Sequence, residues 1–288
     1  MKHRHDFVFL FDCKDGNPNG DPDAANAPRI DPQDMHGLVS DVCLKRKIRN
    51  YVQIAKKNAP GFDIFIQDGG VLNESIRKAH TSLGHNLTLD KRASREQVQN
   101  ARAEMCRRYY DVRTFGAVMS TGADAGKVRG PVQISFSRSI DPVLPLDLSI
   151  TRMAVAEAKN DTSPHKTMGR KGLIPYGLFR CYGFVSAHLA EQSGFNEEDL
   201  NIFWEALSGM FDHDRSANRG FLSAQKLLVF KHDSALGNSP AHKLFDLLSI
   251  AQISEQRSLG RPPRSINDYS ISVDRTRLPQ GVEMIELI

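Results

Sequence analysis

The sequence has few cysteines, and they lie far apart. Four thiols occur in 288 residues, none of them in a C-x-x-C pair: Cys13, Cys43, Cys106 and Cys181. Zinc ribbons and disulfide frameworks need closer or patterned cysteines, so neither is expected. We expect free thiols in a reducing cytoplasm, with no bound metal and no cofactor.

Long hydrophobic runs are also absent. No stretch of about eighteen apolar residues occurs, which excludes a membrane-spanning helix. The apolar run Phe7–Phe11 is too short for the core of a signal peptide and lacks a small-residue cleavage site. We expect it to form the first strand of a soluble protein, since 40% hydrophobic and 25% charged residues are typical of globular chains. The length suits one large domain or two small ones.

The net charge of +4 is unevenly distributed. Residues 42–138 carry 18 basic and 8 acidic side chains, whereas residues 1–41 carry 4 basic and 8 acidic ones. A basic block beside acidic segments indicates a surface for a polyanion such as nucleic acid. The alternative is a solvated surface whose charge is cancelled by acidic neighbours.

Hydrophobic periodicity predicts a mixed chain. The expected strands are 5–12, 131–139, 172–188, 224–231, 269–274 and 282–287, with an extended segment at 146–155, and the expected helices are 35–57, 95–110, 197–211 and 241–250. Ser94 is the expected N-cap of the helix at 95–110, and the helix at 197–211 is expected to begin near Asn196 with Glu197 and Glu198 in its first turn. This order fits an α+β fold in which insertions interrupt a ferredoxin-like βαββαβ sheet.

Two loops partly match ligand-binding motifs. Asp15-x-Asn17-x-Asn19 begins like a calcium loop, but Asn26 stands where the bidentate glutamate should be, which favours a turn rich in Asn and Asp. The segment 122–127 is one residue short of a P-loop and is followed by Val128. A glycine-rich loop that meets phosphate through its backbone and nearby cations is still compatible with this segment.

Two basic segments have both a functional and a structural interpretation. The run Lys45-Arg-Lys-Ile-Arg49 places four cations within five residues, which an anionic partner would stabilise, although it can also be the solvated side of a helix. The segment Arg107-Arg-Tyr-Tyr110, followed by Arg113, alternates cations and aromatic rings. Bases can stack on such tyrosines, or the rings can pack in the core.

Five segments in this order resemble a known family. The chain is similar to the CRISPR-associated backbone subunit that coats guide RNA in type I Cascade complexes (the "Cas-seven" family of the RAMP superfamily), and most closely to its type I-C branch. The similarity covers nearly the whole chain and depends on Asp12–Asp23, Val42–Arg49, Asp111–Ser120, Gly130–Ser137 and Met168–Gly177.

The resemblance implies a modified RNA-recognition-motif palm, with a helical finger insertion at about 58–112 and a β-hairpin thumb at about 155–172. It implies a cytoplasmic protein without catalytic activity whose copies polymerise along the spacer of the guide RNA (crRNA). The thumb would flip out bases at intervals, and the remaining bases would pair with target DNA. Other Cascade subunits would complete the complex.

A coat protein that accepts any spacer must contact phosphate and sugar and leave the base edges free. Under this resemblance, two residues are candidates for the ribose 2′-hydroxyl: Asn19 and Gln133. The candidates for a wedge beside a flipped base are Met153, Val155 and Met168. The candidate phosphate contacts are Lys45, Arg46, Arg49, Arg113, Lys127, Arg129, Arg170 and Lys171.

Two alternatives stay open. Related type III backbone subunits cut RNA with an aspartate in an early loop, so the chain could be a metal-dependent endoribonuclease that uses Asp31 or Asp34. Otherwise we expect one of these residues to cap the helix at 35–57. A DNA-binding protein is the third hypothesis, but no helix-turn-helix signal supports it.

Overall fold

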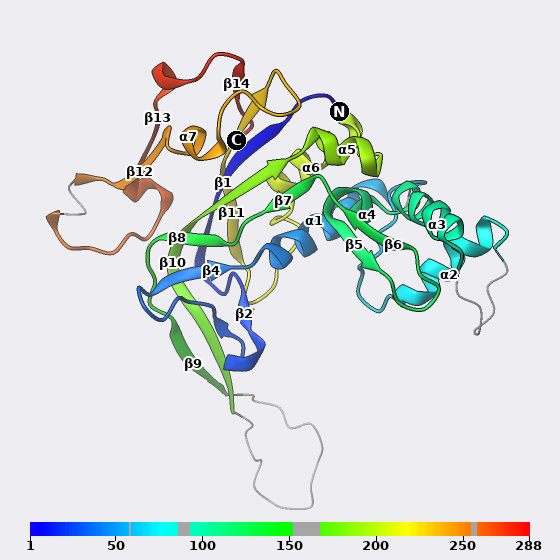
Figure 1. Ribbon diagram of the computed structural model, residues 1–288. Coiled ribbons are helices and arrows are strands. Elements are labelled where there is room, and N and C mark those ends of the chain that lie inside the picture. Colours follow the sequence, from blue (N-terminus) through cyan, green and yellow to red (C-terminus); the bar gives the residue numbers. More distant parts are fainter. Residues whose placement is uncertain (58, 86–92, 152–167, 255–257) are drawn as a thin grey trace, which may run out of the picture.

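The computed structural model describes residues 1–288 except 58, 86–92, 152–167 and 255–257. Its centre is an antiparallel sheet with the strand order β14-β11-β1-β10-β8-β4, and β7 and β9 also pair with β10 (Figure 1). The strands are β1 (His5–Gly16), β4 (His36–Val39), β7 (Val132–Ile134), β8 (Ser137–Pro142), β9 (Leu146–Thr151), β10 (Met168–Val185), β11 (Phe221–His232) and β14 (Val282–Glu286).

Strand β1 lies in the middle of the sheet and is buried on both faces. Phe7, Phe9 and Phe11 alternate with Val8 and Leu10, and all five side chains are at most 1% exposed. The phenylalanines belong to one core cluster and the two aliphatic residues to another, as the period of two in a strand requires. Both faces of the sheet are therefore covered.

Helices cover the phenylalanine face. Leu44, Ile48 and Val52 of α1 (Asp41–Lys56) and Phe203 of α6 (Glu197–Gly209) belong to the same cluster as the phenylalanines. A short helix, α5 (Ala187–Ser193), precedes α6. The opposite face packs against α7 (Ala241–Phe245) and the hairpin of β12 (Leu248–Gln252) and β13 (Tyr269–Val273). The β1-α1-β7/β8-β10-α6-β11 order confirms the predicted α+β class.

The chain between α1 and β7 forms an insertion with its own small core (Figure 1). Buried residues such as Ile76, Ala101 and Met105 fill it. Its elements are α2 (Leu72–Ser82), α3 (Arg95–Arg108), α4 (Tyr110–Phe115), β5 (Gly116–Met119) and β6 (Gly126–Arg129). The predicted finger segment, 58–112, covers α2 and α3 and ends before the β5–β6 hairpin.

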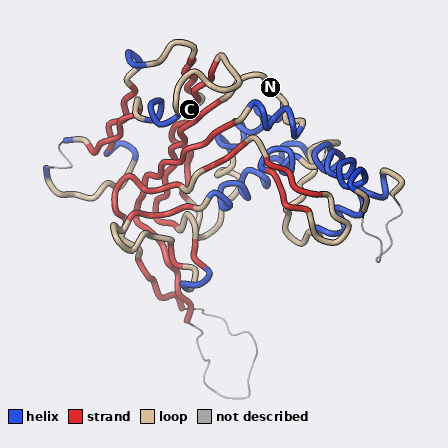
Figure 2. Tube along the Cα trace, in the orientation of Figure 1, coloured by secondary structure: helices blue, strands red, loops and turns tan. Residues whose placement is uncertain are grey.

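A second projection is the hairpin of β9 and the first third of β10, which extends away from the body of the molecule (Figure 2). Leu146 pairs with Leu173 at its base and Thr151 with Met168 at its outer end. Most of the predicted thumb, residues 155–167, lies outside the described residues. A tight turn, β2 (Gly20–Asp21), η1 (Pro22–Ala24) and β3 (Ala27–Pro28), lies beside this hairpin, where Gly172 approaches Pro28.

Several predicted boundaries were wrong. The helix expected at 35–57 begins at Asp41, because residues 36–39 pair with β8 as an edge strand and Ser40 provides the N-cap. Asp31 and Asp34 are therefore not its cap. The helix expected at 241–250 ends at Phe245, since 248–252 pair with β13. The strand at 131–139 is split into β7 and β8.

Other predictions were confirmed. Ser94 and Asn196 cap α3 and α6, each through a reciprocal capping box.

The helices α2, α4 and α5 and the β5–β6 hairpin were not predicted. Within the described part of the chain, no helix is long and apolar enough to span a membrane.

Candidate nucleic-acid interface

The loop after β1 is tied to the start of α1 by one amide. The Asn19 Oδ1 accepts hydrogen bonds from both the backbone nitrogen and the hydroxyl of Ser40, each at 2.9 Å. One turn into the helix, the Cys43 Sγ meets the Pro18 carbonyl oxygen at 3.6 Å. The predicted contact of Asn19 with a 2′-hydroxyl stays a prediction, and its amide oxygen already positions the helix.

The four cations at 45–49 do not share one face. Lys45 binds Asp41 at 2.8 Å, Lys47 is buried against Asp214, and the Arg49 Nε donates to the Asp111 Oδ2 at 2.8 Å. Arg46 is exposed and has no ion-pair partner among the described residues. Only this member of the run is fully available to an anion.

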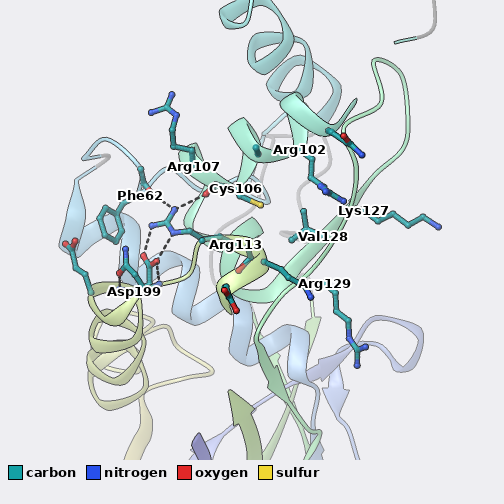
Figure 3. A pocket seen from close by; sticks show the side chains of 18 of the residues that line it. Phe62, Arg102, Cys106, Arg107, Arg113, Lys127, Val128, Arg129 and Asp199 are labelled. Atoms are coloured by element: carbon teal, nitrogen blue, oxygen red, sulfur yellow. Dashed lines mark hydrogen bonds and ion pairs between the residues drawn. The ribbon is translucent and has the colours of Figure 1, made fainter. Parts of the chain in front are cut away.

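Arg113 is held inside the protein. Its guanidinium forms two bonds to Asp199, Nη2 to Oδ1 at 2.6 Å and Nε to Oδ2 at 2.9 Å, and its Nη1 donates to the Gly61 carbonyl oxygen at 2.5 Å (Figure 3). Arg113 is 7% exposed and Arg49 is 8% exposed. These two predicted phosphate contacts need correction, because each cation is buried in an ion pair that joins separate segments of the fold.

Tyr109 and Tyr110, which flank the same basic segment, are also buried. Tyr110 donates from its hydroxyl to the Asp199 carbonyl oxygen at 3.2 Å, and its ring lies 6.0 Å from that of Phe62. Burial raises the pKa of Tyr110 far above its usual value. Of the two interpretations of this segment, core packing is the one the structure supports.

Lys127 and Arg129 border a cavity of about 840 Å³ beside the Arg113–Asp199 pair. Both side chains are exposed on β6 and extend away from that pair (Figure 3). Arg102 and Arg107 of α3 line the same cavity, together with Glu191 of α5 and Glu198 of α6. Four cations therefore gather where the insertion meets the sheet domain.

These four cations lie close to α1, because Phe115 and Gly116 connect β6 to that helix. The Lys45 Nζ lies 5.7 Å from the centre of the Phe115 ring, and the next residue, Gly116, pairs with Arg129. Close packing requires a glycine at 116, because its φ of 84° is left-handed and a side chain would overlap the Val128 carbonyl oxygen.

The foot of the β9–β10 hairpin supplies the other predicted cations. The Lys171 Nζ donates to the Ala217 carbonyl oxygen at 2.5 Å, and Arg170 faces Asp147 at 3.3 Å with both side chains largely exposed. Met168 is 69% exposed at the outer end of the strand pair. Met153 and Val155 lie outside the described residues.

These segments form one surface, which we call the α1 surface: residues 17–28, 41–46 and 168–173. Gly172 packs on Pro28, and the Asn17 backbone nitrogen donates at 2.7 Å to the carbonyl oxygen of Asn218, next to Ala217. Gln133 lies elsewhere: it is exposed on β7 and its Nε2 donates to the Gly130 carbonyl oxygen at 3.0 Å.

Asp31 and Asp34 both bind Arg138, at 2.7 and 2.8 Å. The hydrogen bond from this arginine holds the pKa of the Asp31 carboxyl below its usual value. Among the described residues, no group of three or more His, Cys, Asp and Glu side chains is placed to hold a metal ion. Asp31 and Asp34 therefore hold Arg138 in place. No pattern in the sequence indicates this role, because Arg138 lies more than one hundred residues from either aspartate.

Comparisons with known proteins agree on one family. The model of the family described as "CRISPR-associated protein Cas7" matches residues 3–274. A curated relative from Haloferax volcanii with the same description is 26% identical over 98% of this chain and 84% of its own length.

Two solved structures are also similar. A chain of a "CRISPR RNA-guided surveillance complex, pre-nicking" has a TM-score of 0.49 and 14% identity over 79% of this chain and 78% of its own. A chain of a "CRISPR RNA-guided surveillance complex" has a TM-score of 0.42 and 14% identity over 79% of this chain and 68% of its own.

Proposed function

The chain belongs to the Cas7 family of CRISPR-associated proteins, and from this premise we propose that it binds guide RNA as a backbone subunit of a Cascade complex. Copies of the chain polymerise along the spacer of the crRNA and present it for pairing with target DNA. The complex is of type I-C, works in the cytoplasm, and includes other Cascade subunits.

The observation that carries the proposal is a set of exposed cations that form no ion pair and that lie on α1 of the sheet domain and on β6, where the insertion meets that domain. Arg46 on α1 and Lys127 and Arg129 on β6 are exposed, and none of them forms an ion pair with another described residue. Cations in this state gain most from phosphate, because no existing ion pair has to be broken and condensed counterions are released from the RNA.

The arrangement also supports binding that does not depend on sequence. The exposed cations come from several elements, α1, β6 and the foot of the β9–β10 hairpin, and long flexible side chains reach phosphates without reading base edges. Arg170 completes the set, because its pair with Asp147 is exposed and weak. Arg49 and Arg113 are left out of the set because they are buried.

The proposed role needs no catalysis by this chain. The competing hypothesis is an endoribonuclease that uses Asp31 or Asp34, and both carboxylates are engaged by Arg138. Asp31→Ala and Asp34→Ala distinguish the two: lost RNA cutting with retained binding supports the nuclease. If the RNA stays equally intact with the wild type and with both variants, the result supports a coat protein.

The test is co-expression with a CRISPR array, followed by size exclusion and a denaturing gel of the bound nucleic acid. A large particle that carries RNA of one discrete length is expected. Arg46→Glu should reduce the RNA recovered, whereas Arg77→Glu, the same charge reversal at an exposed site on α2, should not. A monomer without RNA, even with the other Cascade subunits co-expressed, would contradict the proposal.

A further inference from the structure

Two arginines lie directly opposite each other on neighbouring strands. Arg138 of β8 is the register partner of Arg180 of β10. Like charges at directly opposite positions destabilise a sheet unless something neutralises them. Asp31 and Asp34 neutralise Arg138, but no carboxylate among the described residues pairs with Arg180.

Arg180 is nevertheless held in place. Its guanidinium carbon lies 5.2 Å from the centre of the Tyr182 ring, and that ring stacks on Phe245 at 4.5 Å with an interplanar angle of 22°. Arg180, Tyr182 and Phe245 therefore form a stack with the half-buried cation at one end. Phe245 covers one face of the Tyr182 ring. A cation ordered in this way loses little side-chain entropy when it binds an anion.

Arg180 and Tyr182 of this stack line a cavity of about 600 Å³, a size suited to a nucleotide. Phe136, which is 60% exposed, lies at this cavity together with both arginines and His36. The His36 Nδ1 donates to the Ser139 carbonyl oxygen at 2.7 Å, so its Nε2 is the free ring nitrogen. None of the described residues that line the cavity is acidic.

We propose that this cavity, hereafter the Arg180 cavity, binds one nucleotide of a single-stranded nucleic acid, with its phosphate on Arg180 and its base against Phe136. The site goes beyond the proposed guide-binding role. It lies on the sheet face that carries Tyr182 and α7, whereas α1 packs on the opposite face. A strand that occupies it is held separately from the α1 surface.

A nucleotide fits better than an acidic peptide for a structural reason. A peptide usually adds to an open strand edge through main-chain hydrogen bonds. The cavity lies over β8 and β10, whose main-chain groups pair with each other, and it offers side-chain planes and a cation. Bases stack on aromatic rings and on guanidinium planes, and phosphate binds arginine well.

The test uses pentanucleotides, one RNA and one DNA, each with a central 4-thiouridine or 4-thiothymidine, photocrosslinked to the full-length protein and mapped by mass spectrometry. We expect adducts on Phe136 or Tyr182. Arg180→Met keeps the aliphatic stem and should lower their yield about tenfold, in line with the loss of one good stacking and phosphate contact. The matched control is Arg77→Met.

The α1 surface provides the internal comparison. Arg46→Glu should weaken guide binding and leave the adducts unchanged, which separates failure of the proposed function from failure of the second site. Adducts that need Arg46 but not Arg180 would overturn the inference. Displacement of the pentanucleotide by a short peptide of glutamate and phenylalanine, but not by an unlabelled pentanucleotide, would overturn it as well.

The source of the nucleotide is resolved with guide-loaded particles. If loading blocks the adducts, the guide itself occupies the Arg180 cavity, and the inference of a site separate from guide binding is overturned. If adducts persist, a different strand does. The ratio of RNA to DNA yields then shows whether a ribose is required.

Discussion

Arg113 and Asp199 form a two-point ion pair, 2.6 and 2.9 Å long, that joins α4 of the insertion to the first turn of α6. Asp199 also accepts from the Asn196 backbone nitrogen at 3.1 Å, so one carboxylate closes the capping box of α6 and neutralises the buried arginine. Both side chains are at most 8% exposed. The pair therefore fixes the insertion against the sheet domain.

Breaking this pair should destabilise the protein strongly. Asp199→Asn leaves a buried cation without its countercharge, which costs about 3–5 kcal/mol of unfolding free energy. Urea denaturation of the purified chain measures the change. Arg170→Met, which removes an exposed pair with Asp147, should cost less than about 1 kcal/mol. Similar losses in the two variants would contradict the structural role of Asp199.

The ring of Phe7 makes a second testable contact. It lies directly over Gly183 of the neighbouring strand, and a side chain at 183 would overlap it. Gly183→Ala should cost about 1–3 kcal/mol because the ring has to move in a packed core. Gly169→Ala changes the same strand where the nearest atom, the Ile150 carbonyl oxygen, is 3.9 Å away, and should be nearly neutral.

A double variant strengthens this test. Phe7→Leu combined with Gly183→Ala should cost less than the sum of the two single changes, since the smaller side chain leaves room for the methyl group. Strict additivity in urea denaturation would show that the ring and the glycine are not coupled.

Local signals in the sequence predicted part of this architecture. Helix α6 was found because an amphipathic stripe and the Asn196 cap lie within one segment. Helix α2 was missed, because Val71 provides no capping side chain and the buried positions face a small satellite core. Arg46 is exposed, as a phosphate contact has to be, and its role in binding stays a prediction.

The roles of the buried cations depend on long-range partners. Arg49 meets a carboxylate 62 residues away and Arg113 meets one 86 residues away. Pairing of Arg138 with Arg180 likewise depends on strand register. No pattern of neighbouring residues reports such distances, so a basic residue that neutralises a buried acid looks the same in sequence as one that binds phosphate.

Acid should destabilise the protein partly through His5. Burial, followed by the charge of Lys231, lowers the pKa of His5 to about 4 from its usual 6.5. Between these values the unfolded chain binds a proton that the folded chain excludes, so stability falls as the pH decreases from 6.5 to 4. The slope is at most about 1.4 kcal/mol per pH unit.

His5→Gln removes this contribution, so the difference between the pH profiles of the wild type and the variant measures it. The free energy of unfolding is measured in urea at several pH values between 4.5 and 7. The wild type should lose stability more steeply than the variant below pH 6.5. Parallel pH profiles would show that His5 does not titrate differently in the two states.

Arg46 should contribute to RNA affinity without regard to sequence. Arg46→Glu removes one phosphate contact and adds a repulsive charge, so affinity should fall by the same factor for spacers of different sequence. The slope of log affinity against log salt should decrease in magnitude by about 0.7, the value for one phosphate of a single strand. Fluorescence anisotropy at four salt concentrations, with Arg77→Glu as the control, measures both quantities.

Because Lys45 is partly neutralised by Asp41, Lys45→Gln should change the slope less than Arg46→Gln does. A loss confined to some sequences would mean that Arg46 reads base edges and that the α1 surface is not a uniform track for the RNA backbone.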